Sequence, residues 1–194
     1  LGLGIMLGYG QASSHTSSNK SRYSSKGDVD GYNAGLYATW YQNANTMDGM
    51  YVDSLVNYSW LDAKVQGERL HSEDYNINGY SASLEMGYRL PVYQGENSGV
   101  FVTPQAQVIW NGLKADDHTE YNGTRVKSSG SDNIQTRLGM KVSRDGVSDF
   151  DKNSDKLFTV YTEANWLHNS QQAGAMLDDV EIKQTGSRNL GELK

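Results

Sequence analysis

The chain has 194 residues, enough for one sizeable domain, and its formal net charge of −6 argues against a nucleic-acid-binding surface, which needs a basic stripe. Only 37% of the residues are hydrophobic, whereas tyrosine occurs 13 times and tryptophan 4 times, a composition that suits amphipathic surfaces at a water boundary. Because the chain has no cysteine, a disulfide framework and thiolate metal sites are excluded.

The chain opens with LGLGIMLGYG, in which Leu3, Ile5, Leu7 and Tyr9 occupy every second position and glycine fills most places between them. Such alternation predicts a β-strand with one apolar face and one nearly bare face. The glycine spacing does not fit a dinucleotide-binding loop. The uncharged run of about ten residues is also too short for a membrane-spanning helix, which needs roughly twenty.

The same alternation recurs along the chain and predicts further strands, of which YSASLEMGYRL is the clearest. The predicted strands cover residues 32–40, 50–60, 80–90, 100–110, 134–142 and 158–166, with weaker ones at 175–182 and near Leu190. The apolar faces of the clear strands carry no charge. If the protein lies in a membrane, it therefore crosses with strands.

The connections between these strands alternate in length, and aromatic residues gather at the strand ends. Polar segments of about twenty residues alternate with shorter ones, as in outer-membrane barrels with long external loops and short periplasmic turns. Two aromatic girdles are predicted, one near the short turns and one near the long loops: Trp40, Tyr41, Tyr88 and Tyr93, and Tyr58, Trp60, Trp110 and Trp166. The sequence therefore predicts an all-β fold, a transmembrane antiparallel β-barrel.

In such a barrel one face of each strand contacts lipid and the other faces the lumen. The lipid-facing side chains are expected to include Leu84, Met86, Val102, Val108, Leu138 and Val160. The glycines of the first strand then face the interior and leave room for a polypeptide or a bulky side chain, or they only relieve strain in a small curved barrel. Pro104 lies on the apolar face and cannot donate a ladder hydrogen bond, so we expect a bulge or a local break there.

The polar positions of the same strands predict a network of side chains that face the lumen. Its expected members are Asp53, Glu85, Arg89, Gln105, Arg137, Glu163 and Asn165. We expect Glu85 and Arg137 to lie within reach of whatever fills the pore, because charges are tolerated in a wet lumen and costly against lipid. Structural ion pairs are the expected role of the charged members, in preference to catalysis.

No cofactor and no metal ion are expected. The four histidines, His15, His71, His118 and His168, lie in predicted loops and lack the spacing of metal ligands. The segment DFDKNSD begins like a calcium loop, but Ser154 stands where that loop needs glycine and Val160 where it needs glutamate, so a polar turn is expected.

The segments YSASLEMGYRLP, VFVTPQAQVIW, QTRLGMKVS and FTVYTEANWLHN resemble, in order and spacing, signatures of the β (translocator) domain of autotransporters. These are the type V secretion proteins of Gram-negative outer membranes. The resemblance implies a twelve-stranded barrel with an N-terminal helix in the pore, which anchors an adhesin-type or virulence-type passenger at the cell surface and takes part in its export. It also implies outer-membrane lipid or lipopolysaccharide, the barrel-assembly machinery, the passenger and the pore helix as partners. No nucleic-acid partner is expected, because the net charge is negative.

The chain departs from that family pattern at both ends. It stops at LGELK, where the family has a closing strand with a terminal aromatic residue, and it starts inside a strand. We therefore expect residues 1–194 to be an autotransporter β-barrel domain that is incomplete at both ends and covers about eight or nine strands.

Two other classes of protein remain open. One is a different outer-membrane barrel, such as a small porin or a barrel enzyme, and the other is a soluble β-sandwich binding domain. We expect no enzymatic activity, although in some relatives lumenal acids cleave the passenger. These residues do not include the segment that would be cleaved, so the sequence does not predict whether the lumenal acids cleave a passenger.

Overall fold

The structure is a computed structural model that describes residues 1–18, 23–68, 70–95, 98–147, 157–172, 174–183 and 185–194. Within these ranges the chain is built from β-strands, and it contains no helix that is long and apolar enough to cross a membrane. The segment DFDKNSD lies outside the described residues.

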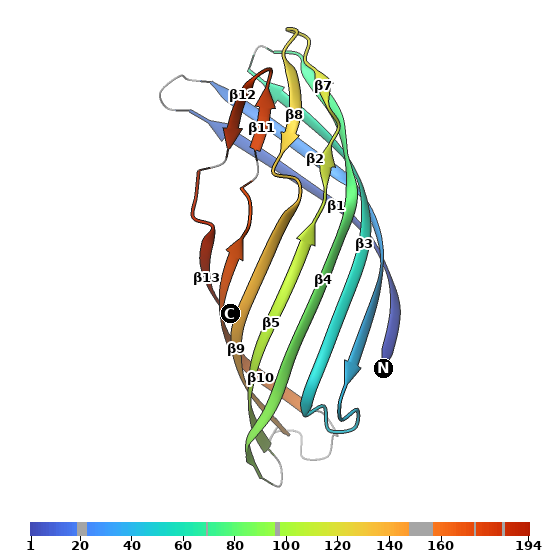
Figure 1. The fold of residues 1–194 in the computed structure, drawn as a ribbon, viewed down its shortest axis with the longest axis vertical. Helices are drawn as coiled ribbons and strands as arrows, with labels where there is room; N and C mark the ends of the chain where they lie inside the picture. The colour runs from blue at the N-terminus through green and yellow to red at the C-terminus, as the bar shows by residue number, and fades with distance from the viewer. Residues whose placement is uncertain (19–22, 69, 96–97, 148–156, 173, 184) are drawn as a thin grey trace.

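One large antiparallel sheet of nine strands forms most of the molecule (Figure 1). Its order is β1-β2-β3-β4-β5-β9-β10-β13, and the short β6 pairs with β4 off this path. The strands are β1 (Gly2–Ser17), β2 (Ser24–Tyr41), β3 (Gly49–Gly67), β4 (Ser72–Gln94), β5 (Ser98–Asn111), β6 (Lys114–Ala115), β9 (Asn133–Val147), β10 (Leu157–Asn169) and β13 (Asn189–Leu193). Neighbours in sequence are neighbours in space, as in an up-and-down barrel.

A second sheet of four short strands lies at the top of Figure 1, beyond the ends of β5 and β10. Its order is β12-β11-β8-β7. The strands are β7 (His118–Thr119), β8 (Arg125–Ser129), β11 (Gly174–Leu177) and β12 (Val180–Lys183). The pairing of β8 with β11 joins the β5–β9 connection to the β10–β13 connection, so two distant connections form one small structure.

The two faces of the large sheet differ in polarity as the alternation predicts. Five of the six side chains expected to face lipid are exposed, and Val102 is half-buried. The buried polar residues of the central strands are instead odd-numbered: Ser59, Thr103, Gln105, Ser143, Glu163 and Asn165. One face is thus apolar and bare, and the other is polar and enclosed, which is the reverse of a water-soluble sheet protein.

The predicted aromatic girdles are present on the apolar face, with one exception. Trp40, Trp60, Trp110 and Trp166 are exposed, and Tyr58 makes edge contacts with Trp60 and Tyr80 at centroid distances of 4.6 Å. The placement of Tyr41 in a girdle was wrong. Tyr41 has odd parity in β2, so its side chain lies on the polar face and lines the cavity described below.

Two glycines on the polar face receive tyrosine rings of neighbouring strands. A Cβ atom at Gly4 would lie 2.3 Å from Cζ of Tyr37, and one at Gly87 would lie 2.4 Å from Cε1 of Tyr51. Tyr37 is the register partner of Gly4, and Tyr51 is that of Gly87. At these two positions the missing side chain makes room for a bulky one, which was the first of the two explanations offered for the opening strand.

We predict that Gly87→Ala destabilises the folded protein by about 1–3 kcal/mol, because the added methyl group displaces the Tyr51 ring and its hydrogen bond to Glu85. Urea unfolding of the full-length protein in lipid vesicles measures this cost. Gly10→Ala is the matched control, since a Cβ atom there meets no atom within 4 Å. Equal unfolding midpoints for the two variants would contradict the close fit of ring and glycine.

The prediction of long polar loops between the first and second strands and between the third and fourth strands was partly wrong. β1 and β2 stay paired from Gly2↔Thr39 to Ser17↔Ser24, and β3 and β4 stay paired up to Gln66↔Ser72. Polar side chains do not end a strand when both faces are in water, because the antiparallel backbone hydrogen bonds continue without an apolar face. Of the weak strands, residues 175–182 fall in the small sheet, and those near Leu190 form β13.

The expected irregularity at Pro104 is a break and not a bulge. Pairing of β4 with β5 stops at Gly87↔Gln105 and resumes at Leu90↔Val102 in the same register, while Pro104 keeps its pairing with Met140 of β9. The register shift lies instead between Pro91 and Tyr93. Of the two prolines, Pro104 thus leaves the register unchanged and Pro91 stands at the shift, so proline in a strand permits a bulge without requiring one.

Candidate functional site

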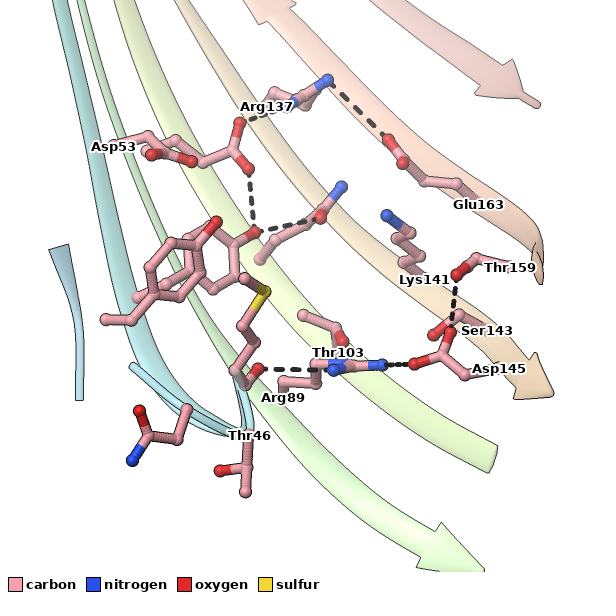
Figure 2. A pocket seen from close by; sticks show the side chains of 16 residues that line it. Thr46, Asp53, Arg89, Thr103, Arg137, Lys141, Ser143, Asp145, Thr159 and Glu163 are labelled. Atoms are coloured by element: carbon pink, nitrogen blue, oxygen red, sulfur yellow. Dashed lines mark hydrogen bonds and ion pairs between the residues drawn. The ribbon is translucent and has the colours of Figure 1, made fainter. Parts of the chain in front are cut away.

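The polar face of the large sheet lines a half-open cavity of about 620 Å³ (Figure 2). Its lining comes from β2, β3, β4, β5, β9 and β10, together with the β2–β3 turn. Every strand residue in this lining has an odd number, so the alternation that exposes the apolar side chains directs these polar side chains inward.

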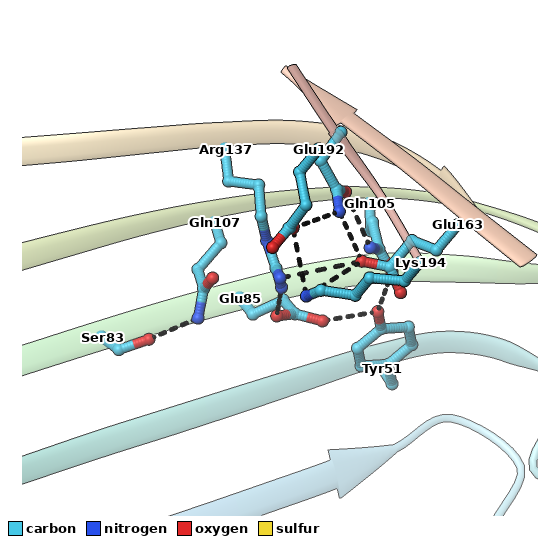
Figure 3. A network of polar contacts seen from close by, with 10 residues as sticks. Tyr51, Ser83, Glu85, Gln105, Gln107, Arg137, Glu163, Glu192 and Lys194 are labelled. Atoms are coloured by element: carbon cyan, nitrogen blue, oxygen red, sulfur yellow. Dashed lines mark hydrogen bonds and ion pairs between the residues drawn. The ribbon is translucent and has the colours of Figure 1, made fainter. Parts of the chain in front are cut away.

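Glu85 and Arg137 stand at the centre of a polar network (Figure 3). An Nη atom of Arg137 lies 2.5 Å from Oε2 of Glu85, and the other Nη lies 3.7 Å from Oε1 of Glu163. The hydroxyl group of Tyr51 donates to Oε1 of Glu85 at 2.8 Å. One guanidinium group therefore links carboxylates of β4 and β10 across two intervening strands.

An amide chain continues this network from β5 to β13. Gln105 donates from Nε2 to Oδ1 of Asn165 at 3.3 Å. Asn165 in turn donates from Nδ2 to Glu163 at 2.7 Å and to Glu192 at 3.0 Å. Lys194 lies 3.1 Å from Glu192 and 3.9 Å from Glu163. The network thus ties the last strand of the sheet to its centre.

A second cluster surrounds Arg89 near the β2–β3 turn. Arg89 forms an ion pair with Asp145, and its guanidinium carbon lies 3.6 Å from the centroid of the Phe101 ring. Thr159 donates its hydroxyl to Asp145 at 2.8 Å. Arg89 also donates to the backbone carbonyl of Met47 at 3.4 Å, so it holds the turn against the rim of the cavity.

Asp48 in the β2–β3 turn is predicted to titrate below the usual range of an aspartate. The Thr46 hydroxyl at 2.5 Å and the Asn43 amide at 2.8 Å donate to its carboxylate and lower its pKa from 3.8. Because the folded-state pKa is lowered, these bonds stabilise the turn above pH 3.8 and are lost as the pH falls through the folded pKa. NMR titration should find the Asp48 pKa below 3.8 and closer to 3.8 in Thr46→Ala, whereas equal values would contradict this cause.

The structure brings six of the seven predicted network residues into direct contacts. Glu85, Arg137, Glu163, Gln105 and Asn165 share the central network, and Arg89 belongs to the second cluster. Asp53 lines the cavity, but its side chain makes no hydrogen bond or ion pair with any described residue.

Several network residues did not figure among the predicted ones. Tyr51 and Asp145 share the odd parity of their strands with predicted members, so the same rule would have found them. Glu192 and Lys194 could not be found in this way, because β13 is short and its sequence shows no clear alternation.

The described residues contain no group of three or more acidic, histidine or cysteine side chains that could hold a metal ion. The placement of all four histidines in loops was wrong, since His15, His118 and His168 lie in β1, β7 and β10. Polar strand extensions outside the apolar band account for this error. What the site does offer is a polar wall on which most charges are already paired.

The whole chain, residues 1–194, matches the family model described as "Autotransporter beta-domain". It is 39% identical over 197 residues to the autotransporter adhesin AIDA-I of Escherichia coli, covering 99% of this chain and 15% of that protein. It is 40% identical to the uncharacterized protein YuaQ of Escherichia coli K12, with 99% of this chain and 14% of that protein covered. The chain thus spans less than half of the length of these relatives.

A solved structure has the same architecture. The crystal structure of the transport unit of AIDA-I from Escherichia coli superposes with a TM-score of 0.89 at 37% sequence identity. The likeness covers 98% of this chain and 62% of the other chain. The strand order, the polar inner face and the apolar outer face described above therefore belong to a known barrel architecture.

Proposed function

Since the chain belongs to the autotransporter β-domain family, we propose that it works as part of a translocator that anchors an N-terminal passenger at the bacterial surface and takes part in its export. The family places the chain in the outer membrane with the passenger on the outside. AIDA-I is named an adhesin, so we propose a passenger of the adhesin or virulence type.

The observation that carries this proposal is the opposite polarity of the two sheet faces. The apolar outer face matches lipid, and the polar inner face lines a half-open cavity of about 620 Å³. The partners on the outside are outer-membrane lipid and lipopolysaccharide, and the barrel-assembly machinery inserts the protein. Inside, we propose that the polar cavity wall receives a helix in the pore, joined to the passenger.

We propose no catalytic step for the chain. Each of the carboxylates Glu85, Asp145 and Glu163 is already paired with an arginine. A carboxylate engaged in an ion pair suits a structural role better than that of a general base.

Cross-linking in the full-length protein tests whether a segment joined to the passenger occupies the cavity. These 194 residues contain no cysteine, so single thiols can carry a photoactivatable cross-linker. Ser143→Cys directs the cross-linker into the cavity, and the neighbouring Val142→Cys directs it outward as a matched control. We expect mass spectrometry to identify peptides from the passenger-linked segment with Ser143→Cys and not with Val142→Cys.

Protease treatment of intact cells tests the anchoring role in the same experiment. The passenger should be digested from outside while this domain stays protected by the membrane. A passenger that is protected, together with cross-links from neither thiol, would contradict the proposed function.

A further inference from the structure

The apolar face of the large sheet carries a cation near one end. Arg144 is exposed and shares the even parity of Leu138, Met140 and Val142 in β9, whose side chains are exposed on that face. The pairing of β9 with β5 and with β10 runs through this position without a register shift, so the side chain of Arg144 points to the same side. A guanidinium group therefore stands on the face that we place against lipid.

Arg144 lies at the end of the sheet that carries the short turns, opposite the small second sheet (Figure 1). Gly146, two residues further along β9, pairs with Ser98, the first residue of β5 after the short β4–β5 turn. Val100 pairs with Arg144 on one side and with the exposed Tyr93 of the predicted girdle on the other. Aromatic girdles mark the depth of the lipid headgroups, and the short turns of outer-membrane barrels face the periplasm. Arg144 therefore lies at the headgroups of the periplasmic leaflet.

A hollow of about 230 Å³ lies on the same face and includes Arg144 in its lining. Val100, Val142 and Val160 supply apolar side chains to it, one each from β5, β9 and β10. Both strands that flank β9 belong to the described chain at this level, so these residues form the hollow without any further strand. Its valines suit a hydrocarbon chain, and its guanidinium group suits an anion.

The position of Arg144 determines which anion it meets. Its register partners are Val100 and Val160, which carry no charge that could oppose it. At this depth the abundant anion is the phosphodiester group of a phospholipid. A guanidinium group can donate two parallel hydrogen bonds to such a group, which an ammonium group cannot do.

We propose that Arg144 and this valine hollow bind one phospholipid of the periplasmic leaflet that has an anionic headgroup, such as phosphatidylglycerol. The guanidinium group holds the phosphodiester, and one acyl chain lies in the hollow. The inference rests on the proposed function only for the outer-membrane location and the orientation of the strands, and it does not depend on the passenger. The site fixes the depth of β9 in the membrane, because the headgroup cannot leave the interface.

Native mass spectrometry of the full-length protein in detergent micelles tests this site with phosphatidylglycerol as the probe. Arg144→Gln should weaken the binding of one phosphatidylglycerol molecule by roughly tenfold, the effect of losing a charge-assisted hydrogen bond. Arg144→Lys, which keeps the charge and loses the paired donors, should weaken it by a smaller factor. Lys64→Gln removes an exposed cation of even parity from β3 at the opposite end of the sheet, and it should leave the binding unchanged.

Three other ligands identify what the site recognises. A diacylglycerol with the same acyl chains lacks the phosphate, inorganic phosphate lacks the chains, and lipopolysaccharide belongs to the other leaflet. The diacylglycerol should bind less tightly than phosphatidylglycerol, and inorganic phosphate should not displace the lipid. Equal binding of the diacylglycerol, displacement by inorganic phosphate, or a loss of lipopolysaccharide alone in Arg144→Gln would each overturn the proposal.

The outcomes separate this site from the function on which it rests. If the protein is recovered from cells outside the outer membrane, the proposed function fails, and the site fails with it. If the protein is in the outer membrane and Arg144→Gln binds phosphatidylglycerol as tightly as the wild type, the site alone is wrong.

Photo-cross-linking of the wild-type protein covers the case in which a variant does not fold. One equivalent of phosphatidylglycerol with a photoactivatable acyl chain is added to the full-length protein in excess detergent. We expect mass spectrometry to find the label on peptides that contain Val100, Val142 or Val160, in preference to the equally apolar peptide of β2 that contains Leu36. Equal labelling of β2 and of the three strands that form the hollow would contradict the site.

Discussion

Leu84→Arg is expected to destabilise the membrane-inserted protein by about 2–4 kcal/mol, the cost of an arginine on the lipid face near the bilayer midplane. Leu84 is exposed and lies midway along β4 between two exposed tyrosines, Tyr80 and Tyr88, which we place in the two aromatic girdles. Its depth therefore corresponds to the middle of the apolar band, where water cannot reach a guanidinium group.

The neighbouring residue provides the control. Ser83→Arg places the same charge one residue away in β4, on the polar face, where Ser83 accepts a hydrogen bond from Gln107 at 2.8 Å. Its expected cost is below about 1 kcal/mol, because a surface-like polar site tolerates such a change. Urea unfolding in lipid vesicles compares the two. Equal losses of unfolding free energy in the two variants would show that both faces of β4 contact the same solvent.

Arg137→Met is expected to cost about 3 kcal/mol, because it removes the cation shared by two carboxylates of low exposure. Arg137 and Glu85 are each 17% exposed, and Glu163 is 10% exposed. Without the guanidinium group, the one side-chain partner left to Glu85 among the described residues is the Tyr51 hydroxyl, whereas Glu163 keeps Asn165 and, at 3.9 Å, Lys194.

A double-mutant cycle tests the origin of this cost. Glu85→Gln removes one of the stranded charges, so Glu85→Gln combined with Arg137→Met should be more stable than Arg137→Met alone. Unfolding in lipid vesicles gives the four free energies of the cycle. If the losses of unfolding free energy in the two single variants simply add in the double variant, the ion pair does not hold β4 to β9. The loss of stability in Arg137→Met then comes from packing alone.

The alternation of residue types predicted the faces of the strands well, and it failed where alternation is weak. In β4, Leu84 and Glu85 are adjacent and differ in polarity, so the parity of the strand determines which side faces the cavity. β13 has five residues and little alternation, and its contribution through Glu192 depends on pairing with β10, which only the three-dimensional structure supplies.

Strand ends were harder to predict, because they depend on pairing and not on composition. The residues of β1 from Ala12 to Ser17 are mostly polar and were expected to lie in a loop, yet they pair with Ser24–Val29 through the backbone. Likewise, the missing donor of Pro104 interrupts one ladder without a change of register, whereas the register shift begins at the other proline of the chain, Pro91. The polarity of the side chains indicates which solvent surrounds a strand. The length of the strand is set by its backbone pairing with the neighbouring strand.

The central claim is that the sheet separates lipid from a polar lumen, and spin labels at two adjacent residues of β5 test it most directly. Val108 is exposed on the apolar face, and Gln107 lies on the polar face, where it donates to Ser83. In the full-length protein in lipid vesicles, a label at residue 108 should be relaxed by oxygen and protected from a water-soluble nickel complex. A label at residue 107 should show the reverse order. Equal accessibility at both positions, or the opposite order, would contradict the account.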